Sequence, residues 1–188
     1  MKLIEEKILK EGKIINDDII KVDNFLNHQI DVELLNDFAV LSAKEFSHVK
    51  VDKILTIETS GIAIGYAFAQ VFKTPLLFAK KSKSQITNND VYHALIKSFT
   101  RNVTSDVIVS KDYLKEGENI LIVDDFLAEG NAALGLIDIC KQAKSNIVGF
   151  VAVVEKGFQG GRKRIEELGI KVVAGATIKE FKNNKPVF

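Results

Sequence analysis

Residues 119–132 read Asn-Ile-Leu-Ile-Val-Asp-Asp-Phe-Leu-Ala-Glu-Gly-Asn-Ala. Four apolar residues, Ile120 to Val123, stand between polar residues and two carboxylates, which is the pattern of a strand buried on both faces. Apolar residues recur at helical spacing from Leu134 onward, so the stretch predicts a strand, an acidic pair, a loop and a helix. We therefore expect Asp124 and Asp125 at the carboxyl end of a parallel strand, where open α/β sheets bind ligands.

The loop after the acidic pair has the composition of a phosphate site. A helix that opens near Gly130 directs unpaired N–H groups and a positive dipole end at the loop, and both suit a phosphate dianion. Ala128 and Ala132 keep large side chains out of the way. The carboxylates of Asp124 and Asp125 repel phosphate, so they indicate a second group to be bound, such as ribose hydroxyls or a metal ion carried by a polyphosphate. These residues predict a ligand that combines phosphate and sugar.

With its acidic pair and small-residue loop, the stretch resembles the signature of the type I phosphoribosyltransferases. The resemblance implies that Asp124 and Asp125 are catalytic and that the loop holds the 5-phosphate of 5-phosphoribosyl 1-diphosphate (PRPP) through Ala128, Glu129, Gly130, Asn131 and Ala132. A purely structural acidic turn is the alternative. Receiver domains also place acidic residues at strand ends, but after the first strand, whereas this pair lies two-thirds of the way along the chain.

The composition is that of one ordinary globular domain. The chain has 188 residues, 46% of them hydrophobic and 27% charged, which is enough for one core. A net charge of +1 gives no basic footprint for nucleic acid. No apolar run has the length of a signal peptide core or a membrane span, so we expect no membrane partner. The single cysteine, Cys140, fits a reducing cytoplasm and is predicted to fill the core.

A second strand, loop and helix precede the acidic stretch. Apolar residues predict a strand over 54–57, a helix over 62–73 and a third strand over 76–79, which together form a βαβ unit. The loop between the first two resembles the diphosphate loop of the family, in which a cis peptide bond is often found. The resemblance therefore implies that diphosphate is bound by Glu58, Thr59, Ser60 and Gly61. An ordinary helix N-cap at Thr59 or Ser60 is the alternative.

Polar residues from Lys80 to Asp90 predict a long loop, which in a compact domain is usually functional or mobile. Alternating residues over 92–100 and an apolar run over 103–109 then predict a hairpin. In the family a flexible loop closes over the diphosphate, and its basic residues can reach a neighbouring subunit. The resemblance thus implies diphosphate binding by Lys80 and Lys81, with solvated lysines as the alternative.

The resemblance covers nearly the whole chain and implies the type I phosphoribosyltransferase fold. That is an α/β fold in which one domain, 1–188, has a central, mostly parallel sheet flanked by helices. A small hood is expected from about 1–35 and 155–188. Stretches 20–31 and 154–162 resemble the bacterial xanthine-specific group, in which residues matching Ile20, Asn27 and Lys156 contact the base.

The expected reaction is the transfer of 5-phosphoribose from PRPP to N9 of xanthine in purine salvage. Mg²⁺ would arrive with PRPP, without direct protein ligands, and the resemblance implies a homodimer. A phosphoribosyltransferase for hypoxanthine and guanine, or for adenine, is the first alternative. The second is a non-catalytic PRPP-sensing regulator, but the roughly fifty residues before the first core strand show no helix-turn-helix spacing.

Overall fold

The computed structural model describes residues 1–15, 19–82, 90–98 and 103–188. Its centre is a seven-stranded sheet of order β5-β6-β4-β3-β7-β8-β9. An antiparallel hairpin, β5 (Val91–Ser98) and β6 (Val103–Ser110), forms one edge. The other strands are parallel: β3 (Lys53–Ile57), β4 (Leu76–Ser82), β7 (Asn119–Leu127), β8 (Asn146–Lys156) and β9 (Val172–Ile178). The predicted mostly parallel α/β sheet is confirmed.

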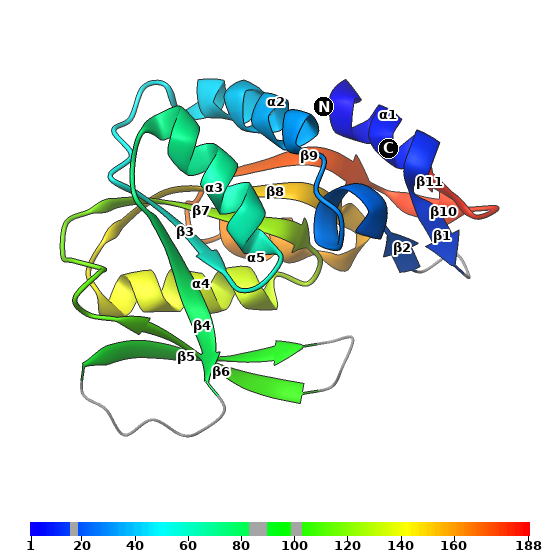
Figure 1. Ribbon diagram of the computed structural model, residues 1–188. Coiled ribbons are helices and arrows are strands. Elements are labelled where there is room, and N and C mark those ends of the chain that lie inside the picture. The colour runs from blue at the N-terminus through cyan, green and yellow to red at the C-terminus, as the bar shows by residue number, and fades with distance from the viewer. Residues whose placement is uncertain (16–18, 83–89, 99–102) are drawn as a thin grey trace.

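Helices cover both faces of this sheet (Figure 1). One face carries α1 (Lys2–Glu11), α2 (Val32–Ala43) and α3 (Gly61–Phe72), and the other carries α4 (Asn131–Gln142) and α5 (Gly161–Glu166). Leu121 and Val123 belong to the first core, and Ile120 and Ile122 to the second, because successive side chains of a strand point to opposite faces. Of the helices described, none is long and apolar enough to span a membrane.

Smaller elements gather near the two chain termini, which lie close together in Figure 1. They are the hairpin of β1 (Lys13–Ile15) and β2 (Ile19–Lys21), the π-helix η1 (Asp23–Asn27), and the hairpin of β10 (Glu180–Lys182) and β11 (Lys185–Val187). Two 3-10 turns, η2 (Lys44–Phe46) and η3 (Gly157–Gln159), complete the chain. Side chains of β2 and η1 join the first core, so these segments are packed onto the main sheet.

Two strand boundaries differ from the sequence expectation, and both affect the site. Strand β7 continues past the acidic pair to Leu127, because this part of it stays paired with β8 as far as Leu127↔Glu155. Strand β4 continues through Lys80 and Lys81 because β6 pairs with it there. The predicted loop therefore begins after Ser82, and its segment 83–89 lies outside the described residues, as does the predicted strand end at 99–100.

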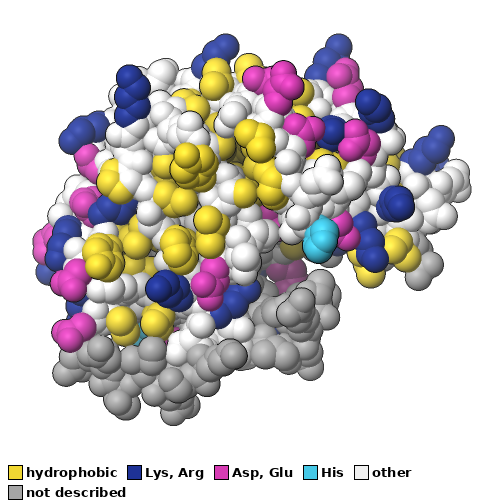
Figure 2. Space-filling view, viewed as in Figure 1, with side chains coloured by type: hydrophobic (Ala, Val, Ile, Leu, Met, Phe, Trp, Pro, Cys, Tyr) yellow, Lys and Arg dark blue, Asp and Glu magenta, His cyan; other side chains and the backbone are white. Residues whose placement is uncertain are grey.

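Figure 2 shows apolar side chains exposed on the face that α2 and α3 cover. Val40 and Leu41 of α2 are 50% and 39% exposed, and Tyr66 of α3 is 62% exposed. Contiguous exposed apolar surface of this kind often marks an interaction site.

Candidate active site

A cleft of about 530 Å³ opens at the carboxyl ends of the central strands. The cleft forms because the pairing of β3 with β7 ends early. These two strands pair only from Lys53↔Ile120 to Leu55↔Ile122, whereas β7 stays paired with β8 to its end. The segments after β3 and along the end of β7 line this cleft, together with the β5–β6 hairpin. This is the edge of the sheet at which the sequence predicted ligand binding.

The acidic pair lies in the cleft with unequal environments. Asp124 is only 4% exposed, whereas Asp125 is half-buried. The Asp125 N–H donates to the Asp124 carboxylate at 2.9 Å, and the Phe126 N–H donates to the Asp125 carboxylate at 2.9 Å. Burial, followed by the nearby charge of Asp125, raises the pKa of Asp124 well above its usual value, and the Lys81 ammonium opposes this only weakly. The pair can therefore accept hydrogen bonds from ligand hydroxyls, with Asp125 the more accessible member.

The loop after β3 lies directly against Asp124. A Cβ at Gly61 would stand 2.0 Å from Thr56 Oγ1 and 3.5 Å from an Asp124 carboxylate oxygen, so only glycine fits there. The peptide bond between Glu58 and Thr59 is cis, as the family resemblance implied. Ser60 stands at the N-cap of α3, but its side chain makes no capping hydrogen bond, so the capping alternative is not realised there.

The structure separates the two lysines at the end of β4. Lys81 lines the cleft, and its backbone N–H donates to the Glu58 carboxylate at 2.7 Å. Lys80 lines a different groove, beside Phe78 and Ile108. Neighbouring residues of a strand point to opposite faces, so one strand cannot place both ammonium groups in one cleft.

The loop of Ala128 to Ala132 forms one wall of the cleft. Gly130 has a φ of +83°, which favours glycine, and is the N-cap of α4, so the helix N-terminus is directed at the cleft. The Asn131 amide donates to the Lys97 carbonyl and to the Glu129 carboxylate, each at 3.2 Å. The polar side chains of this loop are thus tied to protein partners, and its backbone N–H groups are the donors it offers to an anion.

None of the three predicted base contacts is among the described residues that line this cleft. Ile20 is 7% exposed and packs in the first core, Asn27 is exposed at the end of η1, and Lys156 ends β8 opposite Ile178 of β9. Ile20 and Ile178 share one buried cluster, and Phe126 both packs against that cluster and lines the cleft. Phe126 therefore connects the cleft to the buried cluster that contains Ile20.

Sequence reasoning missed the contribution of the edge hairpin. Its residues Ile96, Lys97, Ser105 and Val107 line the cleft beside the phosphate loop, to which Lys97 is joined by the hydrogen bond from Asn131. They have no local signature, because their position depends on the pairing of β4 with β6, a strand more than twenty residues away along the chain.

Thr56 was also missed by the sequence analysis. Its hydroxyl is buried beside Gly61 without a hydrogen-bond partner among the described residues. A threonine inside a buried apolar run is the signal that could have marked it.

A magnesium ion that arrives with its substrate fits this donor set. Within the described ranges, no three or more His, Cys, Asp or Glu side chains are grouped so that they could hold a metal ion. Asp124 and Asp125 nevertheless put carboxylate oxygens, the ligands that Mg²⁺ prefers, at the cleft. An ion already coordinated by a diphosphate needs few further protein ligands.

The chain is similar to known proteins over its full length. Residues 22–183 match the model of the family described as "Phosphoribosyl transferase domain". A xanthine phosphoribosyltransferase of Clostridium novyi (strain NT) is 45% identical over 188 residues, covering 100% of this chain and 99% of the relative. One of Clostridioides difficile (strain 630) is 48% identical over 189 residues, with 100% of both chains covered.

Solved structures support the same fold. The adenine phosphoribosyltransferase of Giardia lamblia in complex with 9-deazaadenine superposes with a TM-score of 0.78 at 18% identity, covering 93% of this chain and 97% of that one. The enzyme of Thermoanaerobacter pseudethanolicus gives a TM-score of 0.74 at 20% identity, covering 92% and 98%. With the family model and the full-length relatives, these matches show that the chain belongs to the phosphoribosyltransferase family and has its type I fold.

Proposed function

We propose that this chain transfers the 5-phosphoribosyl group of PRPP to N9 of xanthine, forming xanthosine 5-monophosphate and releasing diphosphate. Xanthine is the proposed base because two relatives named xanthine phosphoribosyltransferase are 45% and 48% identical to this chain over its full length. The cleft supports the choice of donor, because a helix N-terminus suited to phosphate stands beside carboxylates suited to sugar hydroxyls. The product belongs to purine salvage.

In the proposed mechanism the phosphate loop fixes the sugar. Backbone N–H groups of Ala128 to Ala132 bind the 5-phosphate, and Asp124 and Asp125 accept hydrogen bonds from the ribose hydroxyls. The bond from C1 to diphosphate breaks, leaving positive charge on the sugar ring that the two carboxylates stabilise electrostatically. No covalent intermediate with the protein is required, because N9 of xanthine, which reacts as its anion, attacks the cationic carbon directly as diphosphate leaves.

Diphosphate is proposed to lie against the loop after β3. Glu58, Thr59, Ser60 and Gly61 form this loop, and the Lys81 ammonium stands in the same cleft as a counter-charge. Mg²⁺ bound to PRPP would neutralise further charge on the leaving group. Lys80 faces the other side of β4, so it can meet a diphosphate only in a neighbouring subunit.

Xanthine is proposed to bind under the hood formed by about 1–35 and 155–188, against Ile20, Asn27 and Lys156. Lys156 supplies a cation that can donate to an exocyclic oxygen of the base. The enzyme is proposed to work in the cytoplasm as a homodimer, and the exposed apolar side chains on α2 and α3 supply surface for such contact. Neither nucleic acid nor membrane is a proposed partner.

A base panel tests the proposal directly. Purified protein is given Mg²⁺ and PRPP with xanthine, hypoxanthine, guanine, adenine or uracil, and diphosphate release is measured for each. We expect kcat/KM for xanthine to exceed that for every other base, with xanthosine 5-monophosphate as the product. A higher value for another purine would move the chain to a different branch of the family. Tight PRPP binding without diphosphate release from any base would indicate a regulator.

A further inference from the structure

We infer that Arg164 is a positioning residue for the phosphate loop. Together with Gly161 it fastens residues 128–131 to α5 in the orientation that directs their N–H groups at the 5-phosphate. The inference rests on the proposed function, because it gives this loop the task of binding a phosphorylated pentose. Its test, however, can fail independently of the choice of base.

Two backbone carbonyls of the phosphate loop accept hydrogen bonds from α5. The Gly161 N–H donates to the Ala128 carbonyl at 3.0 Å. The Arg164 guanidinium donates to the Glu129 carbonyl at 2.6 Å and to the Asn131 side-chain oxygen at 3.0 Å. Arg164 thus holds both the backbone of the loop and the side chain at the first position of α4.

These contacts fix the direction of the neighbouring N–H groups. In a planar trans peptide the carbonyl and the following N–H point in opposite directions. Since the carbonyls of Ala128 and Glu129 point at α5, the N–H groups of Glu129 and Gly130 point away from it. Among the residues described, none of α5 lines the cleft, so the loop lies between that helix and the cleft. Successive N–H groups turned the same way form an anion-binding concavity.

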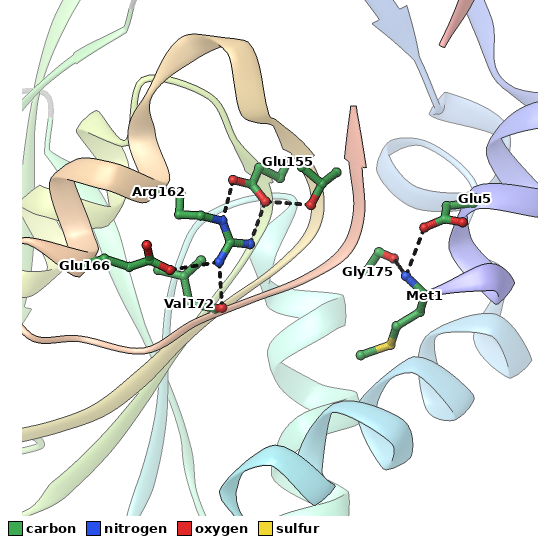
Figure 3. Close-up of polar contacts among 8 residues, drawn as sticks. Met1, Glu5, Glu155, Arg162, Glu166, Val172 and Gly175 are labelled. Atoms are coloured by element: carbon green, nitrogen blue, oxygen red, sulfur yellow. Dashed lines mark hydrogen bonds and ion pairs between the residues drawn. The ribbon is translucent and has the colours of Figure 1, made fainter. Parts of the chain in front are cut away.

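The helix that carries Arg164 is itself held firmly on the sheet (Figure 3). The Arg162 guanidinium binds the buried Glu155 carboxylate through two hydrogen bonds of 2.8 and 2.7 Å, and it donates to the Val172 carbonyl at 2.9 Å. Thr177 donates to the same carboxylate at 2.7 Å. Arg162 therefore anchors α5 to β8 and β9, and α5 can act as a brace for the loop.

Two glycines let the backbone of α5 pack closely against the phosphate loop. A Cβ at Gly161 would stand 2.4 Å from the Ala128 carbonyl oxygen, and one at Gly130 would stand 3.2 Å from the Gly161 Cα. Only the pair of glycines lets the two backbones approach this far. Arg164, in contrast, is exposed, and hydrogen bonds at exposed positions contribute little to folding stability. Its contacts should therefore matter for the loop and little for the fold.

The test compares Arg164→Met with Arg164→Lys and with the control Lys163→Met, which removes a neighbouring exposed cation whose ammonium pairs with Glu167 at 4.0 Å. Binding of ribose 5-phosphate is measured by calorimetry, and the KM values for PRPP and xanthine are measured separately. For Arg164→Met we expect the ribose 5-phosphate Kd and the KM for PRPP to rise about tenfold, the factor that one hydrogen bond to a charged group is worth. The KM for xanthine should stay within about twofold, and the melting temperature within about 2 °C.

Arg164→Lys should recover part of the loss, since an ammonium can still reach one carbonyl, and Lys163→Met should bind like the wild type. Unchanged ribose 5-phosphate affinity in Arg164→Met would overturn the inference, and so would an equal loss in the lysine control. If the wild type itself binds no ribose 5-phosphate, that result contradicts the proposed function, and with it the role given to Arg164. If Arg164→Met is unstable, affinity is measured below its melting temperature, where wild-type affinity again overturns the inference.

Discussion

Asp124→Asn should stabilise the folded protein while abolishing most of its activity. Asp124 is 4% exposed, and it accepts a hydrogen bond from the Asp125 N–H next to the charge of Asp125. Burying an uncompensated carboxylate destabilises the folded state by several kcal/mol. A charged hydrogen bond offsets about 1.5–3 kcal/mol of this loss. Asparagine has the same shape and can accept the same bond. We therefore expect a net gain of about 1–3 kcal/mol, or about 5 °C in melting temperature.

The direction of the pKa shift determines how the stability gain of Asp124→Asn depends on pH. The folded-state pKa of Asp124 is raised above the ordinary value of 3.8, so the folded protein holds this proton more tightly than the unfolded chain does. The wild type therefore loses stability as the pH rises from about 4 through the raised pKa, and the variant does not. Its advantage should grow as the pH rises from about 4 through the raised pKa, and it should vanish below about pH 4.

The assay is thermal unfolding at pH 4 and pH 7.5, with and without Mg²⁺ and PRPP, alongside diphosphate release. Asp138→Asn on the exposed surface of α4 is the matched control and should change neither quantity. We expect Asp124→Asn to lose about a hundredfold in turnover and most of the stabilisation that PRPP gives the wild type. A melting temperature equal to that of the wild type at pH 7.5, or a gain that persists at pH 4, would refute the reasoning.

Three further predictions concern single side chains. Asp125→Asn should cut turnover about a hundredfold with the melting temperature nearly unchanged, since it removes one electrostatic stabiliser from an accessible position; near-normal turnover would exclude this role. Lys156→Ala should raise the KM for xanthine more than the KM for PRPP, and steady-state kinetics showing the reverse would place Lys156 outside the base site. Burial raises the pKa of the Cys140 thiol to about 12, so the folded protein at pH 8 should resist a thiol reagent that labels it rapidly after unfolding. Rapid labelling of the native protein would show that this part of α4 opens.

The sequence determined the parts of the site that follow from local pattern. The apolar run from Ile120 to Val123 has the pattern of a strand buried on both faces, and the residues after it place an acidic pair and a helix N-terminus side by side along the chain. The same logic found the loop from Glu58 to Gly61. These features depend on neighbours in sequence, so spacing and side-chain chemistry were enough.

The tertiary structure decided what depends on pairing between distant segments. The pairing of β6 with β4 extends that strand through Lys80 and Lys81, and the pleat then sends their side chains to opposite faces. It also brings Lys97 and Ser105 to the cleft. Likewise, only the fold places Arg164 against the Glu129 carbonyl, thirty-five residues away in sequence. Which distant strands pair depends on the packing of the whole sheet, so a pattern confined to one stretch of the chain does not show it.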